Sequence, residues 1–254
     1  MTTDGLLLRS TPFGEADAVV QLFTREHGRV SALARGARSS KRRFAGALGL
    51  LVLSDFELKH RPRADLWSLE SALIRRDWTA LAGDVVAVAH LSYALEVVRE
   101  LSPIGIAEPR LLDLLVELHE VMAERGPSPP VLRALELAVL ETLGHAPVLD
   151  ACAACGGELG AGVLFDPGRG GALCAGCAAQ SRGIGVRGFA EGARQLLRAA
   201  RSVERLVDAI AATAAFDDSD RAAARDAMVG MIVAQVGRPL RSVEFIAKLG
   251  HRRG

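Results

Sequence analysis

The chain has 254 residues, of which 50% are hydrophobic and 24% are charged, so it has ample material for a packed interior. A chain of this length is expected to form about two domains. No stretch approaches the roughly 18 apolar residues that a membrane-spanning helix needs, and the Met-Thr-Thr-Asp start does not resemble a secretory signal. These features exclude a globally disordered chain and predict a cytoplasmic protein that does not bind membranes.

The net charge of +1 hides an uneven distribution along the chain. Residues 1–80 carry thirteen Lys and Arg against nine Asp and Glu, a balance of +4. Residues 81–150 carry four against eleven, a balance of −7, and residues 151–254 carry fourteen against ten, again +4. Surfaces of opposite sign are therefore expected to face different partners.

The first 75 or so residues have the pattern of β-structure. Short apolar or alternating runs are separated by turn residues, and Gly28 can supply the positive φ that a tight hairpin needs. The expected strands cover residues 5–9, 18–24, 29–35, 48–58 and 66–71. Five strands are the number found in a small OB-type Greek-key barrel.

A basic segment interrupts these strands. Residues 29–43 include six basic residues and no acidic one, with small Gly, Ala and Ser residues between them. Such a run is often only a solvated loop. A flexible cationic loop beside a barrel face can also follow a phosphate backbone, and we favour this second interpretation. The candidate DNA-binding residues are Arg29, Arg35, Arg38, Lys41, Arg42 and Arg43.

From residue 78 onward the apolar residues recur with helical spacing. Ser102-Pro103, Gly126-Pro127 and Gly237 are typical helix ends. The expected helices cover residues 85–101, 111–122, 132–143, 190–200, 203–213 and 219–236. The polar faces of the first helices carry Glu96, Glu100, Glu117, Glu120 and Glu124.

The only four cysteines form two Cys-x-x-Cys pairs, Cys152 with Cys155 and Cys174 with Cys177, separated by eighteen residues. This spacing is typical of a ribbon that closes a tetrahedral Cys₄ zinc site. A dithiol redox site is the alternative, but it usually has one pair at the start of a helix in a βαβ unit. The doubled pair therefore favours a structural Zn²⁺ ion. A Cys₄ set leaves no open coordination position, so the site would not catalyse.

Other motifs give no catalytic or cofactor-binding site. Residues 183–188 match G-x-G-x-x-G, but no β-strand is expected before them, so a dinucleotide site is not predicted. The six histidines have no partner spacing, and His90 and His119 are expected on helix surfaces or as polar groups in the core. We predict no catalytic residue and no enzyme activity.

Four segments together resemble the RecO family of bacterial recombination mediators. The N-terminal ones are Leu-Leu-Leu-Arg-Ser-Thr-Pro-Phe-Gly-Glu-Ala-Asp (6–17), Leu-Phe-Thr-Arg-Glu-His-Gly-Arg (22–29) and Ala-Arg-Gly-Ala-Arg (34–38). The C-terminal one is Gly-Arg-Pro-Leu-Arg-Ser (237–242). Their order and spacing over almost the whole chain carry the resemblance.

The resemblance implies an α+β multidomain protein with an N-terminal OB-fold β-barrel and a C-terminal all-α domain interrupted by a Cys₄ zinc ribbon. The expected boundaries are 1–78 for the OB-fold, 79–149 and 183–254 for the two parts of the helical domain, and 150–182 for the ribbon. The family's zinc ligands correspond to Cys152, Cys155, Cys174 and Cys177. The candidate for DNA contact is the basic stretch with Arg35, Arg38, Lys41, Arg42 and Arg43.

The resemblance also implies a function. A RecO protein binds single- and double-stranded DNA, anneals complementary strands and, with RecR, helps to load RecA onto DNA covered by single-strand-binding protein. A pocket for the C-terminal tail of single-strand-binding protein is expected in the helical domain. RecA is an indirect partner, the free protein is expected to be a monomer, and its place is the cytoplasm, at the nucleoid.

Aromatic residues are few for a protein that binds single strands. The N-terminal region has Phe13, Phe23, Phe44, Phe56 and Trp67, several of which are expected in the core. We therefore predict DNA binding dominated by phosphate contacts, with a steep salt dependence. The alternatives are a protein-interaction adaptor that binds through its acidic helices, and a dithiol oxidoreductase.

Overall fold

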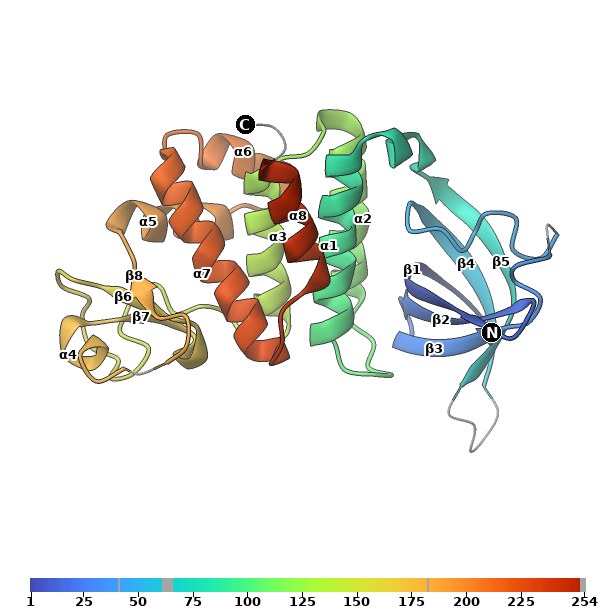
Figure 1. Cartoon of the computed structure of the whole chain (residues 1–254), viewed down its shortest axis with the longest axis horizontal. Helices are drawn as coiled ribbons and strands as arrows, with labels where there is room; N and C mark the ends of the chain where they lie inside the picture. Colours follow the sequence, from blue (N-terminus) through green and yellow to red (C-terminus); the bar gives the residue numbers. More distant parts are fainter. Residues whose placement is uncertain (41, 61–65, 182, 252–254) are drawn as a thin grey trace. The chain divides into compact units, whose positions relative to one another are not determined.

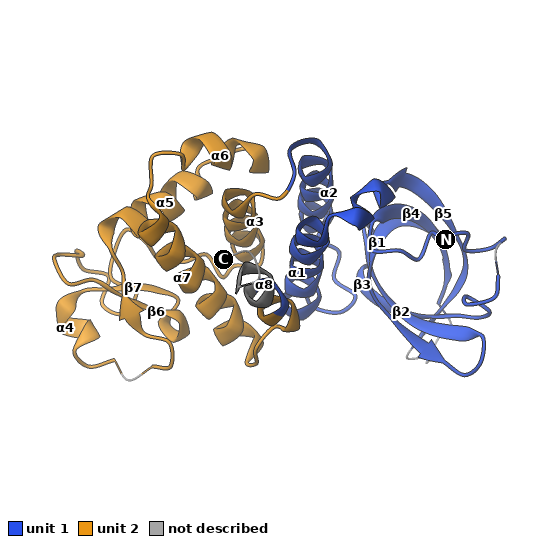
Figure 2. Ribbon diagram, turned by 45° about the horizontal axis from the view of Figure 1, so that its top comes forward, with its two compact units in different colours: residues 1–126, 245–254 blue, residues 127–244 orange. Residues whose placement is uncertain are grey.

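The computed structural model describes residues 1–40, 42–60, 66–181 and 183–251. Their contacts divide the chain into two compact units, residues 1–126 with 245–254, and residues 127–244 (Figure 2). These two units are defined by their contacts and not by fold type. They therefore do not test the expected domain boundaries at 1–78, 79–149, 150–182 and 183–254, which stay predictions.

The N-terminal strands close into a barrel in the order β1-β2-β3-β5-β4 (Figure 1). The strands are β1 (Thr2–Phe13), β2 (Asp17–Thr24), β3 (Gly28–Ala34), β4 (Val52–Lys59) and β5 (Trp67–Asp77). Neighbouring strands are antiparallel except β3 and β5, where Ala32 pairs with Trp67 in a parallel register. This arrangement confirms the predicted OB-type barrel.

Alternating side chains fill the barrel. In β3 the even-numbered residues from Gly28 to Ala34 are buried and the odd-numbered ones are partly exposed, as the period of a strand requires. The interior side chains include Leu7, Leu22, Phe44, Phe56 and Leu58. Gly28 has φ 57°, and a Cβ there would lie 1.8 Å from the Ile106 carbonyl oxygen, so the turn before β3 requires glycine.

Two helices lie in the same unit as the barrel, α1 (Val85–Leu101) and α2 (Pro109–Arg125), after a short 3₁₀ helix, η1 (Thr79–Gly83). The Asp84 carboxylate caps α1 by accepting bonds from Val86 N at 2.9 Å and Ala87 N at 3.1 Å. Ser102 and Gly126 end the two helices, as their sequence signals predict.

Ion pairs fasten α2 to the barrel. Arg25, in the turn after β2, lies 3.0 Å from Asp4 and 2.9 Å from Asp113 of α2. Arg76 of β5 pairs with Glu120 of α2. Part of the acidic charge of the first helices therefore neutralises arginines of the barrel.

His119 of α2 is fully buried, and its ring contacts the Trp78 ring and two backbone carbonyls. Its Nδ1 lies 2.7 Å from Leu115 O, its Nε2 lies 3.1 Å from Leu50 O, and its ring centroid lies 4.7 Å from that of Trp78. The neutral ring has one N–H and can donate to only one of these carbonyls. Burial lowers the pKa of His119 and outweighs the hydrogen bonds to the two carbonyls, which act to raise it.

Acid should therefore destabilise the barrel unit through His119. The pKa of His119 is lower in the folded state than in the unfolded state. The stability that the neutral ring contributes is therefore complete above the unfolded pKa of about 6.5. It is lost as the pH falls below that value, by up to about 1.4 kcal/mol per pH unit. Both tryptophans lie in this unit, so their fluorescence in urea reports its unfolding. We expect the free energy of unfolding to change less between about pH 7.5 and about pH 5.5 in His119→Gln than in the wild type. The same difference in both proteins would contradict this assignment.

The second unit contains helices and a small sheet. The helices are α3 (Pro129–Thr142), α4 (Ala175–Ala178), α5 (Glu191–Arg201), α6 (Ala209–Ala212) and α7 (Asp218–Val236), with 3₁₀ helices η2 (Pro167–Arg169) and η3 (Leu206–Asp208). The sheet has the order β7-β6-β8 and consists of β6 (Leu164–Asp166), β7 (Gly171–Leu173) and β8 (Arg187–Gly188). A further helix, α8 (Arg241–His251), follows Pro239.

Some element predictions were wrong. The strand expected from residue 48 begins at Val52, and residues 42–51 form turns. The helix expected over residues 203–213 is only η3 followed by the single turn of α6. Helix α8 was not predicted, because Pro239 suggested that the helices ended there. No described helix is long and apolar enough to cross a membrane.

Candidate nucleic-acid interface and metal centre

Two turns bring the four cysteines together in the second unit. In the first, Cys152 N donates to Gly157 O and Gly156 N donates to Cys152 O, both at 2.8 Å, with Gly156 at φ 71°. In the second, Cys174 precedes α4 and accepts a bond from Ala178 N at 2.8 Å, which places Cys177 one turn along that helix. Ala153 N donates to Ala172 O at 2.7 Å and joins the first turn to β7.

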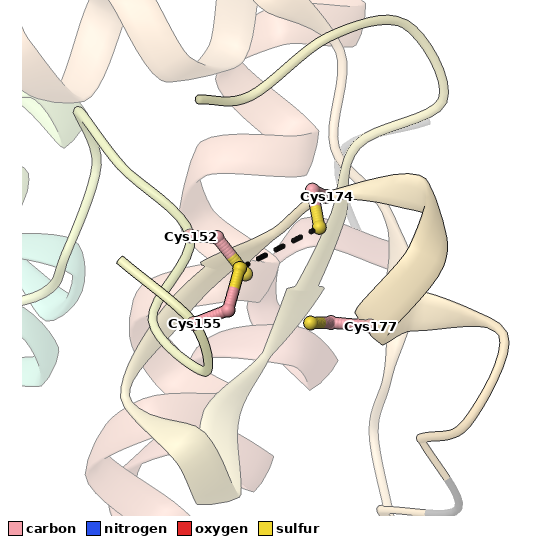
Figure 3. Close-up of side chains that lie close together, drawn as sticks. All are labelled: Cys152, Cys155, Cys174 and Cys177. Atoms are coloured by element: carbon pink, nitrogen blue, oxygen red, sulfur yellow. Dashed lines mark hydrogen bonds between the residues drawn. The ribbon is translucent and has the colours of Figure 1, made fainter. Parts of the chain in front are cut away.

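The four sulfurs point toward a common space and lie within 4.8 Å of one another (Figure 3). Cys155 and Cys174 have their sulfurs 4.0 Å apart, about twice the length of a disulfide bond. A regular tetrahedron with Zn–S bonds of about 2.3 Å would separate the sulfurs by about 3.8 Å. The cluster is thus close to the dimensions of a Cys₄ metal site and consistent with a zinc ribbon.

The close packing of the four thiols shifts the pKa values of two of them in opposite directions. The backbone N–H of Cys174 stabilises the thiolate of Cys152 and lowers its pKa to about 6, while hydrogen bonds to neighbouring thiols, first Cys155, raise the pKa of Cys177 to about 12. Four thiolates at this separation repel one another unless a cation lies among them. With all four positions taken by sulfur, a metal here would hold the two turns together and could not activate water.

The ribbon packs against a helix of the same unit. Phe165 of β6 contacts Phe189 edge to face at 5.0 Å, and a Cβ at Gly230 of α7 would lie 3.1 Å from Pro167 Cγ. The Asp166 carboxylate accepts bonds from Gly168 N, Arg169 N and Ser181 Oγ and so fixes the loop on either side of the cysteines. The fold of the ribbon is therefore linked to that of α7.

The basic loop comprises residues 35–43, directly after β3, and Lys41 lies outside the described residues. Arg35, Arg38, Arg42 and Arg43 are all exposed. None of these four guanidinium groups forms an ion pair with a carboxylate in the described part of the chain. Their positive charge is thus available to a ligand.

Backbone groups hold the basic loop. Arg38 Nη1 donates to Glu15 O at 3.1 Å, Arg43 Nη2 donates to Arg35 O, and the Arg43 guanidinium lies 5.3 Å from the centre of the Phe44 ring. Ala72 N of β5 donates to Arg43 O at 2.9 Å. Carbonyl acceptors leave the charge of these arginines unneutralised, so a phosphate can still bind them.

Arg29 is separate from the basic loop. It lies at the start of β3, whereas the loop follows the end of that strand. Arg29 is partly buried beside the end of α1, where burial lowers the pKa of its guanidinium and Glu100 opposes that shift. The structure thus brings Arg35, Arg38, Arg42 and Arg43 together and leaves Arg29 apart, and a DNA contact by Arg29 stays a prediction.

The aromatic residues of the N-terminal region divide into three groups. Phe23, Phe44 and Phe56 are buried, as expected for core residues. Trp67 lies between two imidazoles, with its ring centroid 5.0 Å from that of His27 and 4.9 Å from that of His60. Phe13 is 57% exposed. The sequence named all five rings but could not separate these groups, because burial depends on the barrel's register.

Comparison with known proteins identifies the family. The model "Recombination protein O N terminal" matches residues 1–77, and "Recombination protein O C terminal" matches residues 82–244. The chain belongs to the RecO family. It is thus a member of a family of DNA repair and recombination proteins, which confirms the resemblance seen in the sequence.

Individual relatives support the same assignment. The DNA repair protein RecO of Anaeromyxobacter sp. (strain Fw109-5) is 40% identical over 252 residues, which cover 97% of this chain and 95% of the relative. The RecO protein of Myxococcus xanthus is 34% identical over 263 residues, 97% of each chain. That of Anaeromyxobacter sp. (strain K) is 47% identical over 175 residues, 68% of this chain and 69% of the relative.

Proposed function

We propose that this RecO-family protein is a recombination mediator that binds single- and double-stranded DNA and anneals complementary strands. With RecR, it helps to load RecA onto single strands covered by single-strand-binding protein. The observation that carries this proposal is the basic loop beside an OB-type barrel, with four exposed guanidinium groups that form no ion pair with a carboxylate among the described residues. Phosphate contacts of this kind bind DNA without regard to sequence, as an annealing protein requires.

Annealing needs the charge of both strands to be neutralised while the pairing edges of the bases stay free. Arginine binds phosphate through a planar fork of N–H donors and leaves the base edges free. Loop arginines outside the barrel can bind phosphates of a single strand or of a duplex. The same surface can thus hold the substrate and the product of annealing.

The other parts of the proposal follow from the family. Cys152, Cys155, Cys174 and Cys177 hold a structural Zn²⁺ ion, and the protein catalyses no reaction. The C-terminal tail of single-strand-binding protein binds the helical domain, and RecA is an indirect partner. The free protein is a monomer. The protein acts in the cytoplasm, at the nucleoid.

The ion pairs of the acidic helices disfavour the alternative of an adaptor. Arg99 lies 3.1 Å from Glu96 and 2.8 Å from Glu100, and Glu120 pairs with Arg76. Glu96 is also buried. Three of the five glutamates expected to form an acidic binding face are therefore already paired within the protein.

A strand-annealing assay tests the proposal. Complementary oligonucleotides, bare or covered with single-strand-binding protein, should anneal faster with the wild-type protein, and Arg35→Ala/Arg42→Ala should reduce this acceleration by roughly tenfold or more. Arg125→Ala/Arg205→Ala removes the same charge from exposed positions elsewhere and serves as the control. A wild-type protein that binds partner proteins but does not accelerate annealing would favour the adaptor.

A further inference from the structure

Phe13 is an exposed aromatic ring at the end of the β1–β2 hairpin. It is the last residue of β1, pairs with Asp17 across the hairpin and is 57% exposed. The hairpin turns at Gly14, whose φ of 60° favours glycine. A single exposed apolar side chain is ordinary on a protein surface. What distinguishes Phe13 is its position beside the basic loop.

Three hydrogen bonds join the hairpin to the basic loop. Gly36 N donates to Asp17 Oδ1 at 2.7 Å, Arg38 N donates to Ala16 O at 3.0 Å, and Arg38 Nη1 donates to Glu15 O at 3.1 Å. Asp17, which accepts the first bond, is the cross-strand partner of Phe13. Directly opposed residues have Cβ atoms only about 5 Å apart. The ring and the arginines are thus parts of one local structure.

This combination of groups matches the chemistry of a single-stranded nucleic acid. Its phosphates suit the guanidinium groups, and its unpaired bases present flat faces that stack on an aromatic ring. In OB-folds the loop between the first two strands is one of those that bind oligonucleotides. A duplex keeps its bases paired and stacked, so it offers phosphates to the arginines but no free base to the ring.

We propose that Phe13 stacks on an unpaired base of single-stranded DNA whose phosphates lie on the basic loop. This inference rests on the proposed function and adds to it the residue that favours single strands over duplex. The other aromatic rings of the described barrel are less suited. Phe23, Phe44 and Phe56 are buried, and Trp67 already contacts two imidazoles.

Equilibrium binding to two probes tests the proposal, an all-thymidine oligonucleotide and a blunt duplex. Phe13→Ala should weaken binding to the oligonucleotide roughly 5- to 150-fold, the range for loss of one stacked base, and change duplex binding by less than about twofold. Phe13→Trp should retain the affinity, and its added indole fluorescence should be quenched by the oligonucleotide. Leu73→Ala, which removes an aliphatic side chain 71% exposed on β5, is the matched control and should bind both probes like the wild type.

The outcomes separate this inference from the proposed function. If Phe13→Ala binds both probes like the wild type, stacking is overturned while phosphate binding stands. If it loses affinity for both probes equally, Phe13 only supports the loop and the inference also fails. If the wild-type protein binds neither probe, the proposed function itself is overturned.

Discussion

Replacing Cys174 with serine should remove the metal from the protein and lower its melting temperature by about 5 °C or more. The four sulfurs lie within 4.8 Å of one another, and the bond from Ala153 N to Ala172 O joins the first turn to β7, which leads into the second. A serine hydroxyl at this position is a poor ligand beside three thiolates. The affinity for the ion and the fold of the ribbon should therefore fall together.

The metal content is measured first, by elemental analysis of the purified protein, and is expected to be one zinc per wild-type chain. Ala175→Ser adds a hydroxyl at the adjacent exposed position and should change neither metal content nor melting. If the Cys174 variant does not fold, limited proteolysis of the wild-type protein with and without a chelator gives the same information, since chelation should open the ribbon to cleavage. A Cys174→Ser protein with wild-type metal content and melting would contradict the structural role.

The elements that the sequence predicted best are those whose pattern is local. Alternation placed the strands of the barrel, and helical spacing with Pro and Gly stops placed α1, α2, α3 and α7. Leu48 and Leu50 continue the alternation of β4, yet they lie in turns, because residues 42–51 cross from β3 to β4 without a strand partner. The three short strands of the ribbon have too few residues to show any period.

For the candidate site, the sequence predicted which residue types form the cysteine cluster and the basic loop, but not which other residues contact them in the fold. The spacing of the cysteine pairs predicted the cluster, because each pair is a local turn, and the density of positive charge predicted the basic loop. The burial of Arg29 beside α1 and the bonds from Gly36 and Arg38 to the β1–β2 hairpin depend on residues that pair only in the folded barrel. Phe13 could not be separated from the core phenylalanines for the same reason.

Removing two charges from the basic loop should weaken DNA binding roughly 10- to 100-fold at low salt, for single strands and duplex alike. Arg35 and Arg42 are the suitable pair, because their side chains are exposed and have no hydrogen bond or ion pair in the described part of the chain. Arg43 is less suitable, since it donates to Arg35 O and lies over Phe44. Arg35→Lys/Arg42→Lys keeps the charge and should retain most of the affinity.

The salt dependence of binding tests the phosphate contacts most directly. The logarithm of the association constant is measured against the logarithm of salt concentration for the wild type, Arg35→Ala/Arg42→Ala and the Arg125→Ala/Arg205→Ala control. Loss of two phosphate contacts should make the slope shallower by about 1.4 for single strands and by about 1.8 for duplex, and the control should keep the wild-type slope. An unchanged slope in Arg35→Ala/Arg42→Ala would show that these arginines do not contact phosphate and would contradict DNA binding by the basic loop.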